Sequence, residues 1–194
     1  GENIIIDSGA YAYTGSYGDR NLFRSTEYHS TPQIERNEIN RFIDPSLIWM
    51  INYDAVPHVH RCCINSDVDT LEAGHSGYHY LEQHLMVSRS FHFHHAKAKV
   101  EIIDQIKMQT ARNVSIPFHL SPEISTEVID DKNVIMSGRY QKFKLTTNNT
   151  GDWRIQLDDG FVSMSYGVKQ PRRVIRFCCE GQRNVKLETT IMAI

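Results

Sequence analysis

Two side chains near the start of the chain could act together on a cation or a proton. The apolar run Ile4–Ile6 ends in Asp7, so a short β-branched strand is expected to deliver a carboxylate to a turn. The turn residues Ser8 and Gly9 follow directly. His29 lies beyond a loop rich in Tyr, Gly and Ser. This separation is too long for one element but natural for neighbouring strands, so Asp7 and His29 are predicted to meet.

The chemistry of this pair has two interpretations. One imidazole and one carboxylate suit Zn²⁺ or a similar cation, provided that further ligands come from elsewhere. The same groups can instead form an Asp–His hydrogen bond that pins the loop. The residues alone leave both open, and Asp7 and His29 are the candidate metal ligands.

The intervening loop is both aromatic and cationic. It holds Tyr11, Tyr13, Tyr17, Arg20 and Arg24. Aromatic rings stack on sugar faces, and arginine binds carboxylates or sulfates through two hydrogen bonds. Alternatively, the tyrosines cover an edge of the fold and the arginines pair with Asp19 and Glu27. Tyr17, Arg20 and Arg24 are the candidate substrate-binding residues here. His75, a loop residue beside Gly74 and Gly77, is a further candidate, for either a substrate-binding or a structural role.

Other histidines and the cysteines carry weaker signals. His92 and His94 share a strand face, but no acidic or cysteine partner is expected nearby, which favours a solvated face over a metal site. His58 and His60 have the same spacing and the same weak case. The cysteines form two adjacent pairs, Cys62-Cys63 and Cys178-Cys179, whose members point to opposite faces of a strand. One of each pair is expected in the core, and a cross-strand disulfide stays open.

Composition limits the class of protein. The chain has 194 residues, of which 40% are hydrophobic, and a formal net charge of −2. This length can fill the core of one large domain, residues 1–194. Apolar runs are too short to span a membrane, and no basic block predicts a nucleic-acid partner. Because the chain opens within a strand, we expect a domain excised from a longer parent.

Nearly every segment alternates at period two between turn residues, which predicts an all-β fold with very little helix. The fold class is a large antiparallel β-sandwich of a supersandwich-like kind. The predicted strands are Ser46–Tyr53, Val59–Asn65, Thr70–Ala73, a long pair within Gly77–Phe93, Val100–Ile106, Ser115–Leu120, Thr126–Asp130, Asn133–Ser137, Phe143–Thr147, Trp153–Leu157, Phe161–Tyr166, Arg173–Cys178 and Val185–Thr190. Turns are predicted at Asn148–Gly151 and Asp158–Gly160.

Two N-terminal motifs resemble a known family. Asp-Ser-Gly-x-Tyr-x-Tyr begins at Asp7, and Arg-Asn-x-Phe-Arg-Ser-Thr-x-x-His ends at His29. Both are similar to the heparinase II/III-like polysaccharide lyases, whose pattern has Asn where this chain has Ser30. The order continues with His-x-Gly-Tyr from His75, the Arg89-x-Phe and Ile-x-Asp104 strands, and Ser-x-x-Tyr-Gly near the end.

The resemblance implies a function. Family members pair such a sandwich with an upstream helical toroid, which this chain lacks. In some members a zinc ion uses this aspartate, this histidine and an upstream histidine, so a Zn site here would be incomplete. The family cleaves uronic-acid glycosides by β-elimination, with acid and base groups outside the matching region. The isolated domain is therefore expected to be inactive, with an acidic polysaccharide and the toroid as partners.

Two points stay open. The rival interpretation is a non-catalytic carbohydrate-binding or structural module of a protein of surface-polysaccharide metabolism. The upstream sequence of the parent would separate the two, since a long helical region with Asn, Tyr and His-x-His supports a lyase. The residues leave the compartment undecided, whereas the resemblance suggests a periplasmic or secreted parent.

Overall fold

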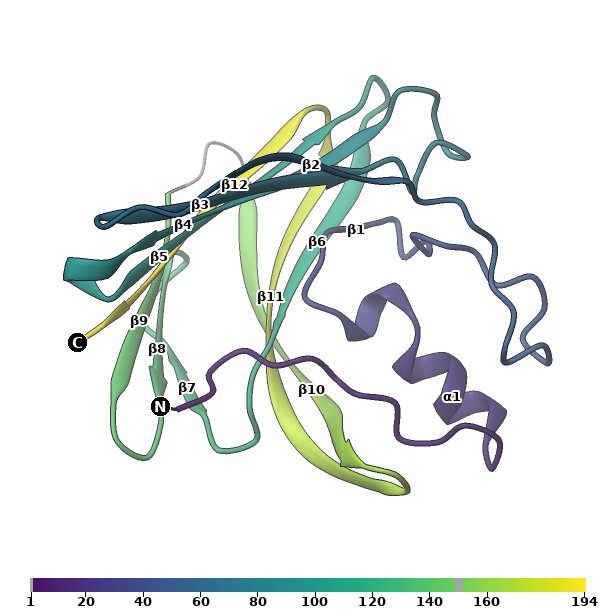
Figure 1. Ribbon diagram of the computed structural model, residues 1–194, viewed down its shortest axis with the longest axis horizontal. Helices are drawn as coiled ribbons and strands as arrows, with labels where there is room; N and C mark the ends of the chain where they lie inside the picture. Colours follow the sequence, from purple (N-terminus) through teal and green to yellow (C-terminus); the bar gives the residue numbers. More distant parts are fainter. Residues whose placement is uncertain (1, 149–151) are drawn as a thin grey trace.

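The computed structural model describes residues 2–148 and 152–194 and shows two antiparallel sheets packed face to face. Strand accounts for 52% of the chain and helix for 7%. Figure 1 shows the sheets crossing each other, with both termini at one end and helix α1 (Tyr17–Phe23) at the other. The predicted all-β sandwich with little helix is confirmed.

The larger sheet has eight strands. In order across the sheet they are β2 (Pro57–Cys63), β3 (Val68–His75), β4 (Met86–His94), β5 (Lys99–Lys107), β12 (Val185–Ala193), β9 (Lys142–Thr147), β8 (Asn133–Ser137) and β7 (Ser125–Val128). A 3₁₀ turn, η2 (His95–Lys97), connects β4 to β5.

The smaller sheet has four strands. Across the sheet they are β1 (Gln33–Ile34), β6 (Arg112–His119), β11 (Val168–Gln182) and β10 (Trp153–Ser165). Alternation divides its two faces. Ile116 and Phe177 are paired in register and belong to the buried core between the sheets, together with Ile102 and Leu187 from the larger sheet. The neighbouring even-numbered positions of β11 face away from that core and carry the polar site described below.

The N-terminal segment runs across the outer face of the smaller sheet. It touches this sheet through isolated bridges, Ile5 to Leu120 and Gly9 to Ser163, so the expected strand ending at Asp7 is only a bridge. Helix α1 follows, where the sequence predicted no reliable helix. Ser16 caps it by accepting from the Asp19 amide at 3.2 Å, and Phe23 is the buried residue that anchors it. A second short turn, η1 (Thr26–Tyr28), leads to His29.

Two strand predictions and one turn prediction are wrong. Ser46–Tyr53 is an irregular loop, because its carbonyls at Ile48 and Met50 accept hydrogen bonds from Arg24 instead of a neighbouring strand. The first half of Gly77–Phe93 is a series of turns. Its backbone closes on itself, for example through the Leu81 amide donating to the Tyr78 carbonyl at 3.0 Å.

The wrong turn prediction is the one at Asp158–Gly160. These residues lie inside β10 and pair with Arg172, Arg173 and Val174 of β11. The acidic side chains satisfy arginines on the partner strand, so the polar run continues the strand. Most of the turn predicted at Asn148–Gly151 lies outside the described residues. The remaining predicted strands are present, with β10 and β11 longer than expected.

Within the described residues, no helix is both long and apolar enough to cross a bilayer.

Candidate functional site

Asp7 and His29 meet, as predicted. His29 Nδ1 lies 2.6 Å from Asp7 Oδ2, while Asp7 Oδ1 accepts from the Gly9 amide at 2.9 Å. Both carboxylate oxygens are therefore engaged. Burial alone would raise the pKa of Asp7, but the hydrogen bonds from Gly9 and His29 outweigh it and lower that pKa. The side chains are 65% and 38% exposed, so the pair lies at the surface, where an ion or ligand can reach it.

A buried arginine of the smaller sheet fixes the Asp7 side of the pair. Arg172 donates through Nη1 to the Ile6 carbonyl at 3.1 Å and through Nη2 to the Ser8 hydroxyl. Ser8 in turn donates to the Tyr28 carbonyl. Arg172 thus holds the residues on both sides of Asp7, and Ser8 connects them to the residue before His29.

His119 completes this network from β6. Its Nε2 lies 3.0 Å from the Glu27 carbonyl, which can only accept, so Nε2 carries the proton. Nδ1 then accepts from Arg172 at 2.8 Å. Burial, helped by the neighbouring Arg172 charge, lowers the pKa of His119 to about 3. The imidazole is therefore neutral and acts as a fixed part of the structure.

A partly buried arginine of the larger sheet fixes the His29 side. Arg89 forms two parallel hydrogen bonds to Asp104, Nε to Oδ1 at 2.7 Å and Nη2 to Oδ2 at 2.9 Å. Its remaining Nη1 donates to the Ser30 carbonyl, and the Ser30 hydroxyl accepts from the His119 amide at 3.1 Å. The residue after His29 is thus tied to both sheets. Sequence reasoning noted Arg89 and Asp104 only as motif positions and missed this contact.

The pair supplies an incomplete set of metal ligands. Among the described residues, no group of three or more His, Cys, Asp or Glu side chains could hold an ion. Asp7 and His29 offer two ligand atoms of types that Zn²⁺ accepts, but both Asp7 oxygens already accept hydrogen bonds. A metal at this position would need further ligands from outside the described part of the chain.

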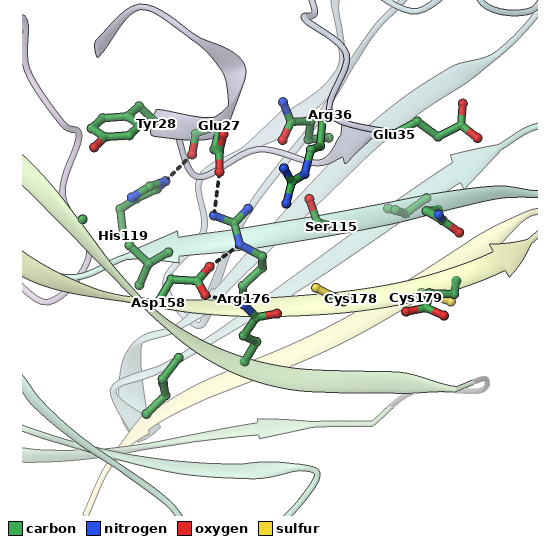
Figure 2. Close-up of a pocket in the computed structure, with 18 of the residues that line it drawn as sticks. Glu27, Tyr28, Glu35, Arg36, Ser115, His119, Asp158, Arg176, Cys178 and Cys179 are labelled. Carbon is green, nitrogen blue, oxygen red and sulfur yellow. Dashed lines mark hydrogen bonds and ion pairs between the residues drawn. The ribbon is translucent and has the colours of Figure 1, made fainter. Parts of the chain in front are cut away.

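A polar cavity of about 980 Å³ lies beside the pair on the outer face of the smaller sheet. Figure 2 shows Arg176 at its centre, bridging Glu27 at 3.5 Å and Asp158 at 2.5 Å. Its charged lining residues are Glu27, Glu35, Arg36, Asp158, Asp159, Arg176 and Glu180. Carboxylates outnumber guanidinium groups, so this cavity suits a polyanion poorly. Its lining comes from segments far apart in sequence, so no local motif pointed to it.

The predicted substrate-binding residues do not form one cluster. Tyr17 is exposed on α1. Arg20 lies over the rings of Tyr13 and Trp49, 5.5 and 5.4 Å from their centroids. Arg24 is occupied by the Ile48 and Met50 carbonyls and serves to hold the loop. The alternative pairing of the arginines with Asp19 and Glu27 is wrong, because Asp19 binds Lys169 at 2.9 Å and Glu27 approaches Arg176.

His75 lies apart from these residues, at the end of β3. Its Nδ1 accepts from the Gly77 amide at 3.2 Å, and its ring packs 6.0 Å from that of Tyr78. Burial lowers its pKa to about 4. These contacts indicate a neutral, structural imidazole, and none of them supports the predicted role in substrate binding.

The structure also shows the surroundings of the remaining histidines and of the cysteines. His94 does have an acidic partner, Glu101 at 2.8 Å on the adjacent strand, and His95 approaches Asp69 at 3.2 Å, so the expectation that no acidic partner lies nearby is wrong. Pairing across strands brought these groups together, which sequence spacing did not reveal. The four cysteines are free. Cys179 is buried as expected, but Cys62 is exposed and Cys63 is only partly buried, so the prediction of one core cysteine per pair is wrong for the first pair.

The two sheets, the long β10–β11 hairpin and the N-terminal segment folded across the smaller sheet define an antiparallel β-sandwich. Residues 1–191 match the family described as heparinase II/III-like, C-terminal, and the chain belongs to that family. No curated protein sequence gave a significant match.

Solved structures share the fold. The chain superposes on heparan sulfate lyase HepC from Pedobacter heparinus with a TM-score of 0.80 and 18% identity, covering 100% of this chain and 29% of that one. A structure titled Heparinase III gives a TM-score of 0.80 at 15% identity, and the heparinase III BT4657 gene product gives 0.79 at 18%. Each of these two superpositions covers 100% of this chain and 28% of the other chain. The chain therefore spans less than a third of these proteins.

Proposed function

We propose that this chain is the C-terminal β-sandwich of a lyase that cleaves a uronic-acid-containing polysaccharide by β-elimination. The observation that carries the proposal is the family match over residues 1–191, together with the pair that the family motif predicted, His29 Nδ1 at 2.6 Å from Asp7 Oδ2. In this proposal the sandwich braces a helical toroid of the same parent, and the acid and base groups lie in that toroid.

An exposed apolar loop supports the bracing role. The loop is closed by the Asn52 amide donating to the Arg41 carbonyl at 2.9 Å and by the Arg41–Asp54 ion pair at 2.8 Å. Despite this order it exposes Ile43, Leu47, Met50, Ile51, Tyr53 and Val56. An ordered surface with this much exposed apolar area is typical of an interface. It lies on the α1 end in Figure 1, away from both chain termini.

In the proposed parent, Asp7 and His29 would hold a Zn²⁺ ion together with a histidine from the segment upstream of Asp7. Bound zinc would supply structural rigidity where sandwich and toroid meet. The contribution of this chain is to orient the two ligands. Arg172 and Arg89 do so by holding Ser8 and Ser30.

The test compares the parent protein with the 194-residue chain alone on heparosan, heparan sulfate and alginate. We expect the parent to form unsaturated uronate products, detected by their ultraviolet absorbance, and the isolated chain to form none. His29→Ala in the parent should reduce the rate, whereas His79→Ala, at an exposed position, should not. A parent inactive on all three polymers, or turnover by the isolated chain, would overturn the proposal.

A further inference from the structure

Three exposed aromatic rings converge beside helix α1 from distant parts of the chain. Tyr13 comes from the first loop, Trp49 from the loop that Arg24 holds, and Tyr166 from the β10–β11 turn. Tyr13 lies 6.0 Å from Trp49 and 5.6 Å from Tyr166 between ring centroids, with interplanar angles of 22° and 28°. The three side chains are 47%, 65% and 62% exposed. We call these rings with Arg20 the aromatic platform.

Arg20 gives the aromatic platform a positive charge. Its guanidinium lies over the Tyr13 and Trp49 rings at 5.5 and 5.4 Å. In the described part of the chain it forms no ion pair with a carboxylate, because the neighbouring Asp19 binds Lys169. The Nε of Arg20 is buried without a partner, so a ligand would bind through its Nη groups.

The aromatic platform is built on a fixed backbone. Arg24 donates to the carbonyls of Ile48 and Met50, which flank Trp49, at 2.9 and 3.0 Å. Next to Tyr166, the Gly167 amide donates to the Tyr11 carbonyl at 2.7 Å and so ties the hairpin turn to the first loop. Binding would therefore order few additional groups, which favours affinity.

We propose that the aromatic platform binds a pyranose ring that carries a carboxylate or sulfate group. The C–H face of a sugar is apolar and flat enough to lie on an exposed aromatic ring, and the acidic substituent pairs with Arg20. Charge decides between this ligand and an apolar protein partner. Aliphatic side chains would leave the Arg20 guanidinium buried without an anion, which is costly. The polar cavity of Figure 2, with its excess of carboxylates, offers no comparable site.

The proposal shares its ligand class with the proposed function but needs neither the Asp7–His29 pair nor a toroid. The aromatic platform lies wholly within this chain, so the isolated 194-residue chain should bind glycan even though it should not cleave it.

Tryptophan fluorescence offers a direct measurement. The chain has two tryptophans, of which Trp49 is 65% exposed and Trp153 is 6% exposed in the core. Titration with a heparosan tetrasaccharide, built of glucuronic acid and N-acetylglucosamine, should change the emission through Trp49. Cellotetraose, which is neutral, should bind more weakly, and added salt should weaken only the heparosan tetrasaccharide.

Variants locate the site, with binding measured by calorimetry where Trp49 itself is changed. Trp49→Ala and Tyr166→Ala should each weaken binding by roughly tenfold, comparable to removing one ring from beneath a stacked nucleobase. Arg20→Gln should remove the preference for the acidic tetrasaccharide. Tyr140→Ala is the matched control, because Tyr140 is also exposed and Arg139 lies 5.2 Å from its ring centroid, yet among the described residues Tyr140 stacks on no second ring.

Two results would overturn the inference. One is that the heparosan tetrasaccharide shows no saturable binding, and the other is that Tyr140→Ala and Trp49→Ala lower the binding affinity equally. Unfolding curves in urea show whether each variant is folded, and Trp49→Phe, which keeps a ring, should retain most of the affinity. The outcome is separate from that of the proposed function. If the parent is active but the isolated sandwich does not bind glycan, only the proposal for the aromatic platform is refuted. If the parent is inactive but the sandwich binds glycan, only the proposed lyase function is refuted.

Discussion

Gly9 lies directly against the backbone of Ser163, where the N-terminal segment crosses the end of β10. The Ser163 amide donates to the Ser8 carbonyl at 2.8 Å, and a Cβ on Gly9 would overlap the Ser163 carbonyl oxygen. Gly9 also has φ of +73°, which disfavours any other residue. Because the Gly9 amide donates to Asp7 Oδ1, this close approach helps to set the position of the Asp7 carboxylate.

Gly9→Ala should therefore lower the free energy of unfolding by more than about 3 kcal/mol, since it adds a backbone clash to left-handed strain. Gly167→Ala is the matched control. Gly167 has φ of +72°, but nothing lies within 4 Å of its added Cβ, so only the strain of about 1–2 kcal/mol should appear. Urea unfolding measures both. Equal losses would show that Ser163 gives way easily and that the close approach is unimportant.

The Arg89–Asp104 pair predicts a second stability difference. Asp104 is fully buried and the Arg89 side chain is 16% exposed. Removing Arg89 therefore leaves the buried Asp104 charge without a partner. Arg89→Met should cost about 3–5 kcal/mol, and adding Asp104→Leu should recover much of that loss. Arg173→Met, in the exposed pair with Asp159, should cost no more than about 1 kcal/mol. A double variant less stable than Arg89→Met alone would contradict this.

The strands that could be predicted are those whose two faces differ in environment. Val100, Ile102 and Ile106 alternate with polar residues because β5 lies in the middle of the larger sheet with one face on the core. Prediction failed where side-chain contacts override local pattern. Asp158 and Asp159 look like a turn, yet arginines of β11 bind them within a strand.

The site shows the same division. Asp7 and His29 were identifiable because motif and turn residues mark them locally. The groups that hold them are residues 89, 104, 119 and 172, and nothing in the local sequence indicates that they meet. Half of the aromatic platform could be predicted, because Tyr13 and Arg20 are close in the sequence. Trp49 and Tyr166 are brought to them only by folding.

Acid should destabilise the protein through His119. Its pKa is about 6.5 when unfolded and about 3 when folded, so the unfolded state binds the extra proton between these values. The stability that depends on neutral His119 is fully present above pH 6.5 and is lost as the pH falls toward 3. His119→Gln should flatten the fall in unfolding free energy over this range by up to about 1.4 kcal/mol per pH unit. Urea unfolding from pH 8 to pH 4 measures this, and unchanged slopes would contradict the assignment.

Zinc binding by the isolated chain should be weak and should require both predicted ligands. Complete structural zinc sites reach about 10–16 kcal/mol, so two protein ligands, with the Asp7 oxygens already hydrogen-bonded, should give a Kd no tighter than ~1 µM. Zn²⁺ should raise the thermal unfolding midpoint only at concentrations above this Kd, and chelation should reverse the rise.

His29→Ala and Asp7→Asn should each abolish the zinc-dependent rise. The matched control is His94→Ala, because His94 and Glu101 form another imidazole–carboxylate pair at 2.8 Å on the larger sheet. Arg172→Lys tests how the ligands are oriented. A lysine keeps the charge but cannot hold Ile6, Ser8 and His119 together. The loss in zinc-binding free energy should therefore exceed the loss in unfolding free energy of the metal-free chain. If His94→Ala removes the zinc effect while His29→Ala preserves it, the metal assignment of Asp7 and His29 is wrong.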